Sequence, residues 1–190
     1  MFNDLVRRNR CYRRFYEDVE ISIDTLKELV DLARLSATGG NKQPLKFYLS
    51  CDPDRNSKIF PLLTWAGALP DWPGPSEGER PSAYIIILGD TEVSKSFGID
   101  HGIAAQTILL GATEVGFGGC MLGSIRKDEA QKLLNVPSRY EILLTIALGK
   151  PKERVVIDTM KPGDDTKYWR EKDSTHHVPK RSSEDILISE

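Results

Sequence analysis

The chain has 190 residues, of which 39% are hydrophobic and 28% are charged, and its formal net charge is −2. This length gives one domain, residues 1–190, with a substantial core, and two full domains are not expected. No apolar run reaches the roughly 18 residues of a membrane helix, and no apolar stretch follows the basic start, so we expect neither a membrane segment nor a secretory signal.

Residues 7–14, RRNRCYRR, hold five arginines directly after a short helix that we predict over residues 2–8. Three interpretations are open: a nucleic-acid arm, a solvated helix face, or one side of a binding site for an anion. The slightly acidic chain argues against a nucleic-acid partner, because affinity for phosphate backbones needs a basic field spread over a surface.

The next element is a helix predicted over residues 21–37, with Ser22 as its N-cap. Its apolar face follows the i, i+3, i+4, i+7 rule and consists of Leu26, Leu29, Val30 and Ala33. Gly39 and Gly40 provide the backbone freedom for its end. A strand is expected over residues 46–50.

Residues 51–82 are rich in turn formers and show little periodicity, which predicts a long irregular segment. Within it, residues 64–82 are expected to form an active-site loop that carries Trp65 and Trp72. The apolar run AYIIILGD, residues 83–90, predicts a strand that is buried on both faces.

Residues 99–118 have helical length but are apolar nearly all round, which indicates a helix in the core or in an obligate subunit interface. Three further elements are predicted after it: a short strand through GGCMLGS, a helix that stops before Pro137 and a strand over residues 141–149. Residues 151–180 are charged and poor in core formers, so an extended arm is expected. The end, PKRSSEDILI, is expected to dock as a strand or turn. Together the elements predict an α+β sandwich with a small central sheet between helices.

Several site classes are not supported by the sequence. The three cysteines, Cys11, Cys51 and Cys120, are widely spaced, and the histidines do not add metal-ligand spacing, so we expect no disulfide framework, no metal and a cytoplasmic location. The glycine-dense run GFGGCMLG follows a helix and has Met121 at the last glycine position of G-x-G-x-x-G, which excludes a dinucleotide fingerprint.

Six motifs in order resemble the nitroreductase family of FMN-dependent oxidoreductases. They are RCYRRF, SATGGNKQPL, YIIIL, DHGIAAQTILLGA, GFGGCMLG, and IALGKP with the basic tail PKRSSEDI. The resemblance runs from about Arg8 to Ile186. It implies a three-layer fold with a mixed, mainly antiparallel central sheet, in a homodimer whose C-terminal arm, residues 151–190, packs on the partner subunit. It also implies FMN in two clefts at the subunit interface.

The resemblance also implies roles for individual residues. The FMN phosphate and ribityl chain would be held by Arg10, Cys11 and Arg13, with Arg13 reaching the N1/C2 edge of the flavin and Arg14 as the alternative to it. Cys11 replaces the usual serine, so only a backbone contact is expected there. The other cofactor contacts would come from Thr38, Gly39, Asn41, Gln43, Met121, Leu122, Gly123, Ser124, Lys180 and Arg181, with the Gly123 and Ser124 backbone beside N5.

The activity implied by the family is reduction of nitroaromatic, quinone or similar small acceptors by NADH or NADPH through a ping-pong hydride transfer. No side chain is expected to act as a catalytic acid or base, and Trp65 and Trp72 would shape the acceptor site. An FMN store or sensor, or another flavin chemistry such as dehalogenation or flavin breakdown, is the alternative.

Overall fold

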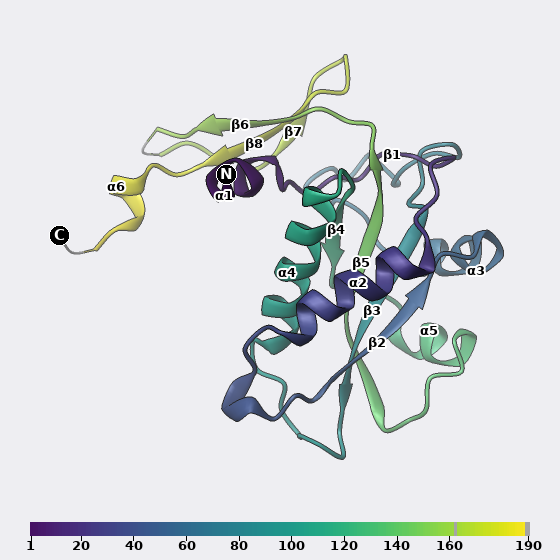
Figure 1. The fold of residues 1–190 in the computed structure, drawn as a ribbon. Coiled ribbons are helices and arrows are strands. Elements are labelled where there is room, and N and C mark those ends of the chain that lie inside the picture. Colours follow the sequence, from purple (N-terminus) through teal and green to yellow (C-terminus); the bar gives the residue numbers. More distant parts are fainter. Residues whose placement is uncertain (162, 189–190) are drawn as a thin grey trace.

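The computed structural model describes residues 1–161 and 163–188, and a five-stranded sheet lies at its centre (Figure 1). The strands are β1 (Phe15–Tyr16), β2 (Leu45–Ser50), β3 (Ala83–Asp90), β4 (Gly118–Leu122) and β5 (Tyr140–Pro151). Their order is β1-β5-β3-β2, with β4 paired to β5 as well. Each of these pairings is antiparallel. The central strand β3 has the bounds predicted from its apolar run.

Helices cover both faces of this sheet. They are α1 (Phe2–Arg8), α2 (Ile23–Arg34), α3 (Pro53–Ile59), α4 (Asp100–Glu114) and α5 (Lys127–Leu133). Alternate β3 residues show the two sides: Ile85 and Ile87 pack with α2 and α4, whereas Ile86 and Leu88 pack with Ile59 and Ala130. The predicted three-layer α+β sandwich is therefore confirmed. No helix in the described residues is long and apolar enough to span a membrane.

Local sequence signals account for several element boundaries. Ser22 caps α2 as predicted, because its hydroxyl accepts a hydrogen bond from the Thr25 amide. The prediction of irregular structure throughout residues 51–82 was wrong at its beginning, where α3 is capped by Asp52 and has Pro53 in its first turn. Residues 64–82 form neither helix nor strand, which agrees with the predicted loop.

The C-terminal arm contains more regular structure than the sequence suggested. It forms a second, three-stranded sheet from β6 (Val155–Thr159), β7 (Trp169–Arg170) and β8 (His176–Lys180), in the order β6-β8-β7. In this sheet β6 and β8 pair in parallel. A short helix, α6 (Ser183–Ile186), follows, where a strand or turn was expected. Figure 1 shows this sheet beside one end of the central sandwich.

The close approach of β4 to β5 depends on Gly119. A Cβ added there would lie 2.1 Å from the Ala147 carbonyl oxygen, which is part of the backbone. We expect Gly119→Ala to lower the free energy of unfolding by about 1–3 kcal/mol, because one of the two strands must shift. Urea unfolding would measure this loss.

Gly67→Ala is the matched control, since a Cβ there would meet nothing within 4 Å. It should change the free energy of unfolding by no more than about 0.5 kcal/mol. Equal losses in the two variants would contradict a specific role for Gly119 in the β4–β5 contact.

Candidate functional site

The arginine segment runs alongside the start of β4. Cys11 forms a bridge with Gly119, and the Tyr12 amide donates to the Gly119 carbonyl at 3.0 Å. The Arg10 guanidinium donates to the Val6 carbonyl at 2.7 Å, while its Nε is buried and has no partner in the part of the chain that the structure describes. This segment is therefore fixed by its backbone, and a buried donor of Arg10 is left unpaired.

Arg14 is neutralised within the chain. Its guanidinium donates two hydrogen bonds to the Glu79 carboxylate, at 2.6 and 2.7 Å, and Lys152 lies 3.0 Å from the same carboxylate. Hydrogen bonding from Arg14 lowers the pKa of Glu79 to about 2. The Arg14–Glu79 pair therefore stabilises the folded state at pH values above the ordinary pKa of a carboxyl group. This contribution is lost as the pH falls from that value toward 2. Arg14 therefore has a structural partner, which makes it a poorer cofactor candidate than Arg13.

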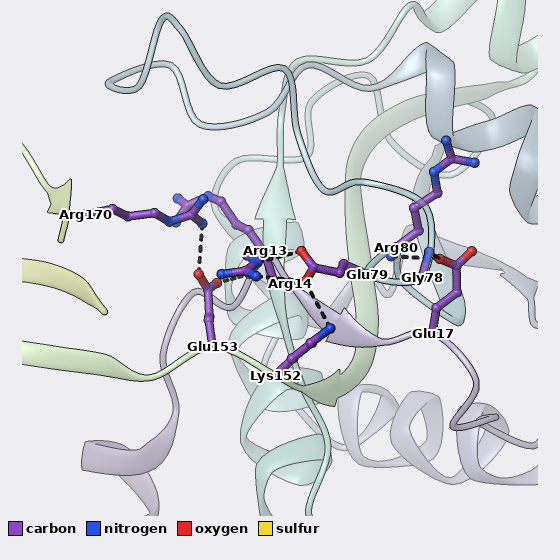
Figure 2. Close-up of polar contacts among 9 residues, drawn as sticks. All are labelled: Arg13, Arg14, Glu17, Gly78, Glu79, Arg80, Lys152, Glu153 and Arg170. Atoms are coloured by element: carbon purple, nitrogen blue, oxygen red, sulfur yellow. Dashed lines mark hydrogen bonds and ion pairs between the residues drawn. The ribbon is translucent and has the colours of Figure 1, made fainter. Parts of the chain in front are cut away.

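A buried carboxylate, Glu153, connects the arginine segment to the C-terminal arm (Figure 2). Its fully buried side chain accepts a hydrogen bond from the Arg13 amide and another from Arg170, at 2.8 Å. Arg170 in turn lies over the Trp72 ring, with Cζ 4.0 Å from the ring centroid. Thus Glu153 holds β7 of the arm against both the arginine segment and the loop 64–82.

The Arg13 side chain meets two aromatic residues of the arm. Its guanidinium lies 3.4 Å from Nε2 of His176, and its Cζ lies 4.9 Å from the centroid of the Tyr168 ring. His176 is fully buried, and its Nδ1 has no partner among residues 1–161 and 163–188. Burial, followed by the charges of Arg13 and Arg170, lowers the pKa of His176 to about 4, so the imidazole is neutral at pH 7.

The predicted polar turn, residues 38–43, lies at the start of α4. The Gly39 amide donates to the Asp100 carboxylate at 2.9 Å, and the Gln43 amide donates to the Thr38 hydroxyl at 3.2 Å. Asn41 and Gln43 both have left-handed backbone, with φ of 52° and 51°. Such conformations are uncommon for non-glycine residues, and here they leave both side chains exposed to solvent.

The stretch from Met121 to Ser124 ends β4 at the surface. Leu122 is buried, whereas Gly123 and Ser124 are exposed, and a Cβ at Gly123 would meet nothing within 4 Å. The Ser124 carbonyl accepts a hydrogen bond from the Thr64 amide at 2.9 Å. The exposed backbone at the end of β4 therefore lies next to the beginning of the loop 64–82.

The two tryptophans of this loop have different surroundings. Trp65 is only 5% exposed and packs on Phe60, with ring centroids 5.6 Å apart. Trp72 is partly exposed beneath Arg170, and the Ala68 amide of the same loop donates to the Tyr168 hydroxyl at 3.2 Å. Trp72 is thus the tryptophan whose position depends on the arm, and a substrate role for either stays a prediction.

The predicted tail cations do not take part in this cluster. Lys180 and Arg181 are exposed at the end of β8, and within the described residues it is Arg170 and His176 that accompany Arg13. Sequence reasoning missed these two residues together with Glu153. No local motif marks them, because each meets Arg13 or the loop only through the folding of the arm.

The predicted site residues fall into two groups at opposite ends of α4. Asn9, next to Arg10, donates to the Thr113 hydroxyl near the end of the helix, whereas the turn 38–43 contacts Asp100 at its start. The rise of 1.5 Å per residue places these ends about 20 Å apart. One chain therefore brings the arginines together with Arg170, but it does not bring them close to the polar turn.

Comparison with known proteins identifies the family of this fold and site. The model of the Nitroreductase family matches residues 6–150. The chain belongs to the nitroreductase family. A relative from Archaeoglobus fulgidus, named NADH dehydrogenase/NAD(P)H nitroreductase, is 28% identical over 148 residues, which cover 74% of this chain and 80% of that protein.

Solved nitroreductase structures share the fold. The nitroreductase family protein from Streptococcus pneumoniae has a TM-score of 0.71 at 14% identity, with 100% of both chains covered. The FMN-dependent nitroreductase from Clostridium difficile has a TM-score of 0.64 at 21% identity, with 79% of this chain and 87% of that chain covered. The predicted family and fold class are confirmed, and the names of these relatives agree with the predicted FMN and NAD(P)H chemistry.

Proposed function

We propose that this nitroreductase family member binds FMN and uses NADH or NADPH to reduce nitroaromatic, quinone or similar small acceptors in a ping-pong reaction. The observation that carries the proposal is the group of arginines beside the start of β4, a strand whose other end leads into the exposed backbone of Gly123 and Ser124. A group of cations at one end of a strand and accessible backbone amides at its other end suit a ligand with a phosphate at one end and a polar planar ring at the other.

The residues of this chain fit the phosphate end of FMN. Among the described residues, the Arg10 Nε is buried without a partner, and the hydrogen-bond contacts of the Arg13 guanidinium, to the Cys11 carbonyl and to His176, are long at 3.4 Å. Guanidinium groups bind phosphate through parallel hydrogen bonds, so these donors suit the FMN phosphate and ribityl chain. The exposed Cys11 would contribute its backbone, because a thiol is a weak donor.

Contacts to the flavin ring of FMN would come from both groups of predicted site residues, those near the arginines and those of the turn 38–43. The Gly123 and Ser124 amides would donate to the N5 edge, and Arg13 would lie at the N1/C2 edge, where positive charge favours the reduced flavin. Asn41 and Gln43, with Thr38 and Gly39, would contact the ring from the other side. Because these turn residues lie about 20 Å from the arginines along α4, they would come from a second copy of the chain.

A surface suited to such a second copy lies on α1, α2 and α4. Exposed apolar side chains on or next to these helices include Phe2 (69%), Leu32 (41%), Leu35 (67%), Ile99 (75%) and Val115 (57%). A groove between the helices is lined by Leu5, Leu32, Leu35 and Leu110. A two-fold dimer over this surface would cover the apolar patch and complete two equivalent sites.

When bound, FMN supplies a ring nitrogen that accepts hydride from NADH or NADPH and passes it to the acceptor. This chain would hold the phosphate with Arg10, place Arg13 along the ribityl chain toward the N1/C2 edge, orient the ring with backbone amides of Gly123 and Ser124, and bound the acceptor space with Trp72. One cleft would receive donor and acceptor in turn, which is the basis of the ping-pong proposal.

The test is the colour of the purified protein and its response to NADH and NADPH. We expect a yellow protein whose flavin absorbance is bleached anaerobically by one or both nucleotides and is restored by a nitroaromatic compound or a quinone. A yellow protein that neither nucleotide bleaches would favour a flavin store or sensor. A colourless protein that FMN does not stabilise against heat would contradict the flavin proposal itself.

A further inference from the structure

A pocket lies on the face of the central sheet that α3 covers. Its walls come from the turn after β1, from α3 and from the segment that leads into β3. Its volume is about 150 Å³. A single water molecule needs roughly 10–15 Å³, so the pocket has room for a small organic molecule. None of its lining residues is among the predicted FMN contacts or the two loop tryptophans, so the proposed function leaves this pocket unassigned.

Three polar side chains that line the pocket have a buried atom without a hydrogen-bond partner in the described part of the chain. These atoms are the Tyr84 hydroxyl, the Ser82 hydroxyl and Nε of Arg80. Tyr84 has no exposed surface, and its side chain lies on the α3 side of β3, in one cluster with Ile59 and Ile86. Burial raises the pKa of Tyr84 above its ordinary value, so its hydroxyl stays neutral and can donate or accept. Because buried polar atoms ordinarily have partners, three such atoms at one pocket indicate a ligand that forms hydrogen bonds.

The charged groups of the pocket lie on two sides of it. The turn after β1 contributes three carboxylates, those of Glu17, Asp18 and Glu20, and the segment before β3 contributes one cation, Arg80. The Glu17 carboxylate accepts hydrogen bonds from the backbone amides of Gly78 and Arg80, whereas the Arg80 side chain extends away from it (Figure 2). The Arg80 guanidinium lies over the Phe60 ring instead, with Cζ 4.6 Å from the centroid. The acidic side therefore attracts a cation, while Nε of Arg80 can donate only to a hydrogen-bond acceptor.

We propose that this pocket binds a small α-amino acid in its zwitterionic form. The ammonium group lies toward the carboxylates of the turn after β1, and the carboxylate accepts hydrogen bonds from Arg80, Ser82 and Tyr84. A short apolar side chain fits the remaining wall, to which Phe60 and Pro81 contribute. An amine alone would leave the Arg80 donor without an acceptor, and an acid alone would leave the carboxylates without a cation. The inference goes beyond the proposed function and does not rest on it.

Isothermal titration calorimetry of the full-length protein with matched probes tests the class of ligand. L-alanine is compared with propanoate, which lacks the ammonium group, and with ethylamine, which lacks the carboxylate. L-valine is compared in the same way with isovalerate and isobutylamine. We expect at least one of the two amino acids to bind once per chain with a Kd below about 1 mM, and its two fragments to bind at least about tenfold more weakly. No binding of either amino acid would show a pocket that holds water alone and would overturn the proposal, as would a fragment that binds as tightly as its amino acid.

Variants of two lining residues connect the binding to this pocket. Tyr84→Phe removes one hydroxyl and should weaken amino-acid binding about tenfold, because a hydrogen bond to a carboxylate is lost. Tyr48→Phe is the matched control, since Tyr48 lies on β2 on the same face of the sheet but does not line the pocket, and it should bind like the wild type.

Arg80→Met keeps an apolar stem beside Phe60 but removes the charge and the Nε donor. It should lower the preference for the amino acid over its matching amine at least about tenfold, a ratio that a general loss of folding would not change. Unchanged affinities in both Tyr84→Phe and Arg80→Met would place the binding elsewhere and overturn the site. The titration involves no electron transfer, so its failure is separate from a failure of the flavin proposal.

Discussion

Replacing Glu153 with alanine is expected to lower the free energy of unfolding by about 3–5 kcal/mol, because the change leaves buried cations without their counter-charge. The fully buried carboxylate is the hydrogen-bond acceptor for the Arg13 amide and for the Arg170 side chain. With an alanine in its place, Arg170 keeps its buried position beside Arg13 and Arg14 with no carboxylate to offset it.

Urea unfolding at fixed protein concentration would measure this loss, since assembly of a dimer makes apparent stability depend on concentration. Glu129→Ala is the control, because the Glu129–Arg126 pair is about half exposed on both sides and should contribute no more than about 1 kcal/mol. Glu153→Gln keeps an oxygen acceptor and should lose less stability than the alanine variant. A loss for Glu153→Ala as small as that for Glu129→Ala would show that Glu153 does not hold the arm.

The parts of the fold that could be predicted are those whose signals are local. The apolar run of β3 and the capped periodicity of α2 lie within a few residues of sequence, and both elements formed where they were expected. The helix α3 was missed although Asp52 and Pro53 are ordinary signals for a helix start, because the composition around them favours turns. Its seven residues are also too few to show a clear period.

The arm could not be predicted because its sheet depends on pairings between distant segments. β6 pairs with β8 in parallel, and β7, which lies between them in sequence, pairs with the same strand in the antiparallel direction. Few of these residues are apolar enough to reveal a buried face. An extended arm was therefore the natural interpretation of a segment whose order comes from long-range contacts and charge pairs.

In the candidate site, too, local sequence signals could be predicted and contacts between distant segments could not. The arginine run predicts a place for an anion, and its sequence alone does not distinguish an arginine with an acidic partner from one without. Arg14 is paired with Glu79, 65 residues away, whereas Arg13 is left with long contacts. Likewise, the motif marks Lys180 and Arg181, while folding brings Arg170 and His176 to Arg13. Partners of this kind are set by tertiary structure and leave no pattern in the local sequence.

The proposed dimer leads to a second large effect, at Leu32. Leu32→Glu should convert the protein to a monomer and lower its affinity for FMN by about ten- to a hundredfold. The introduced carboxylate would be buried without a partner in an apolar interface, which costs several kcal/mol. Loss of the second copy would then remove the contacts of Asn41 and Gln43, at about 1–1.5 kcal/mol for each hydrogen bond.

Leu133→Glu is a close control, because Leu133 also lies in the last turn of a helix and has a similar exposed fraction, 38% against 41% for Leu32. It belongs to α5, on the opposite face of the sheet, so it should leave the assembly and FMN binding unchanged. Light scattering would give the mass, and flavin fluorescence would give the affinity. A Leu32→Glu protein that stays dimeric would place the interface elsewhere. A monomer that binds FMN as tightly as the wild type would mean that one chain supplies all the contacts, so that the turn 38–43 has no part in the site.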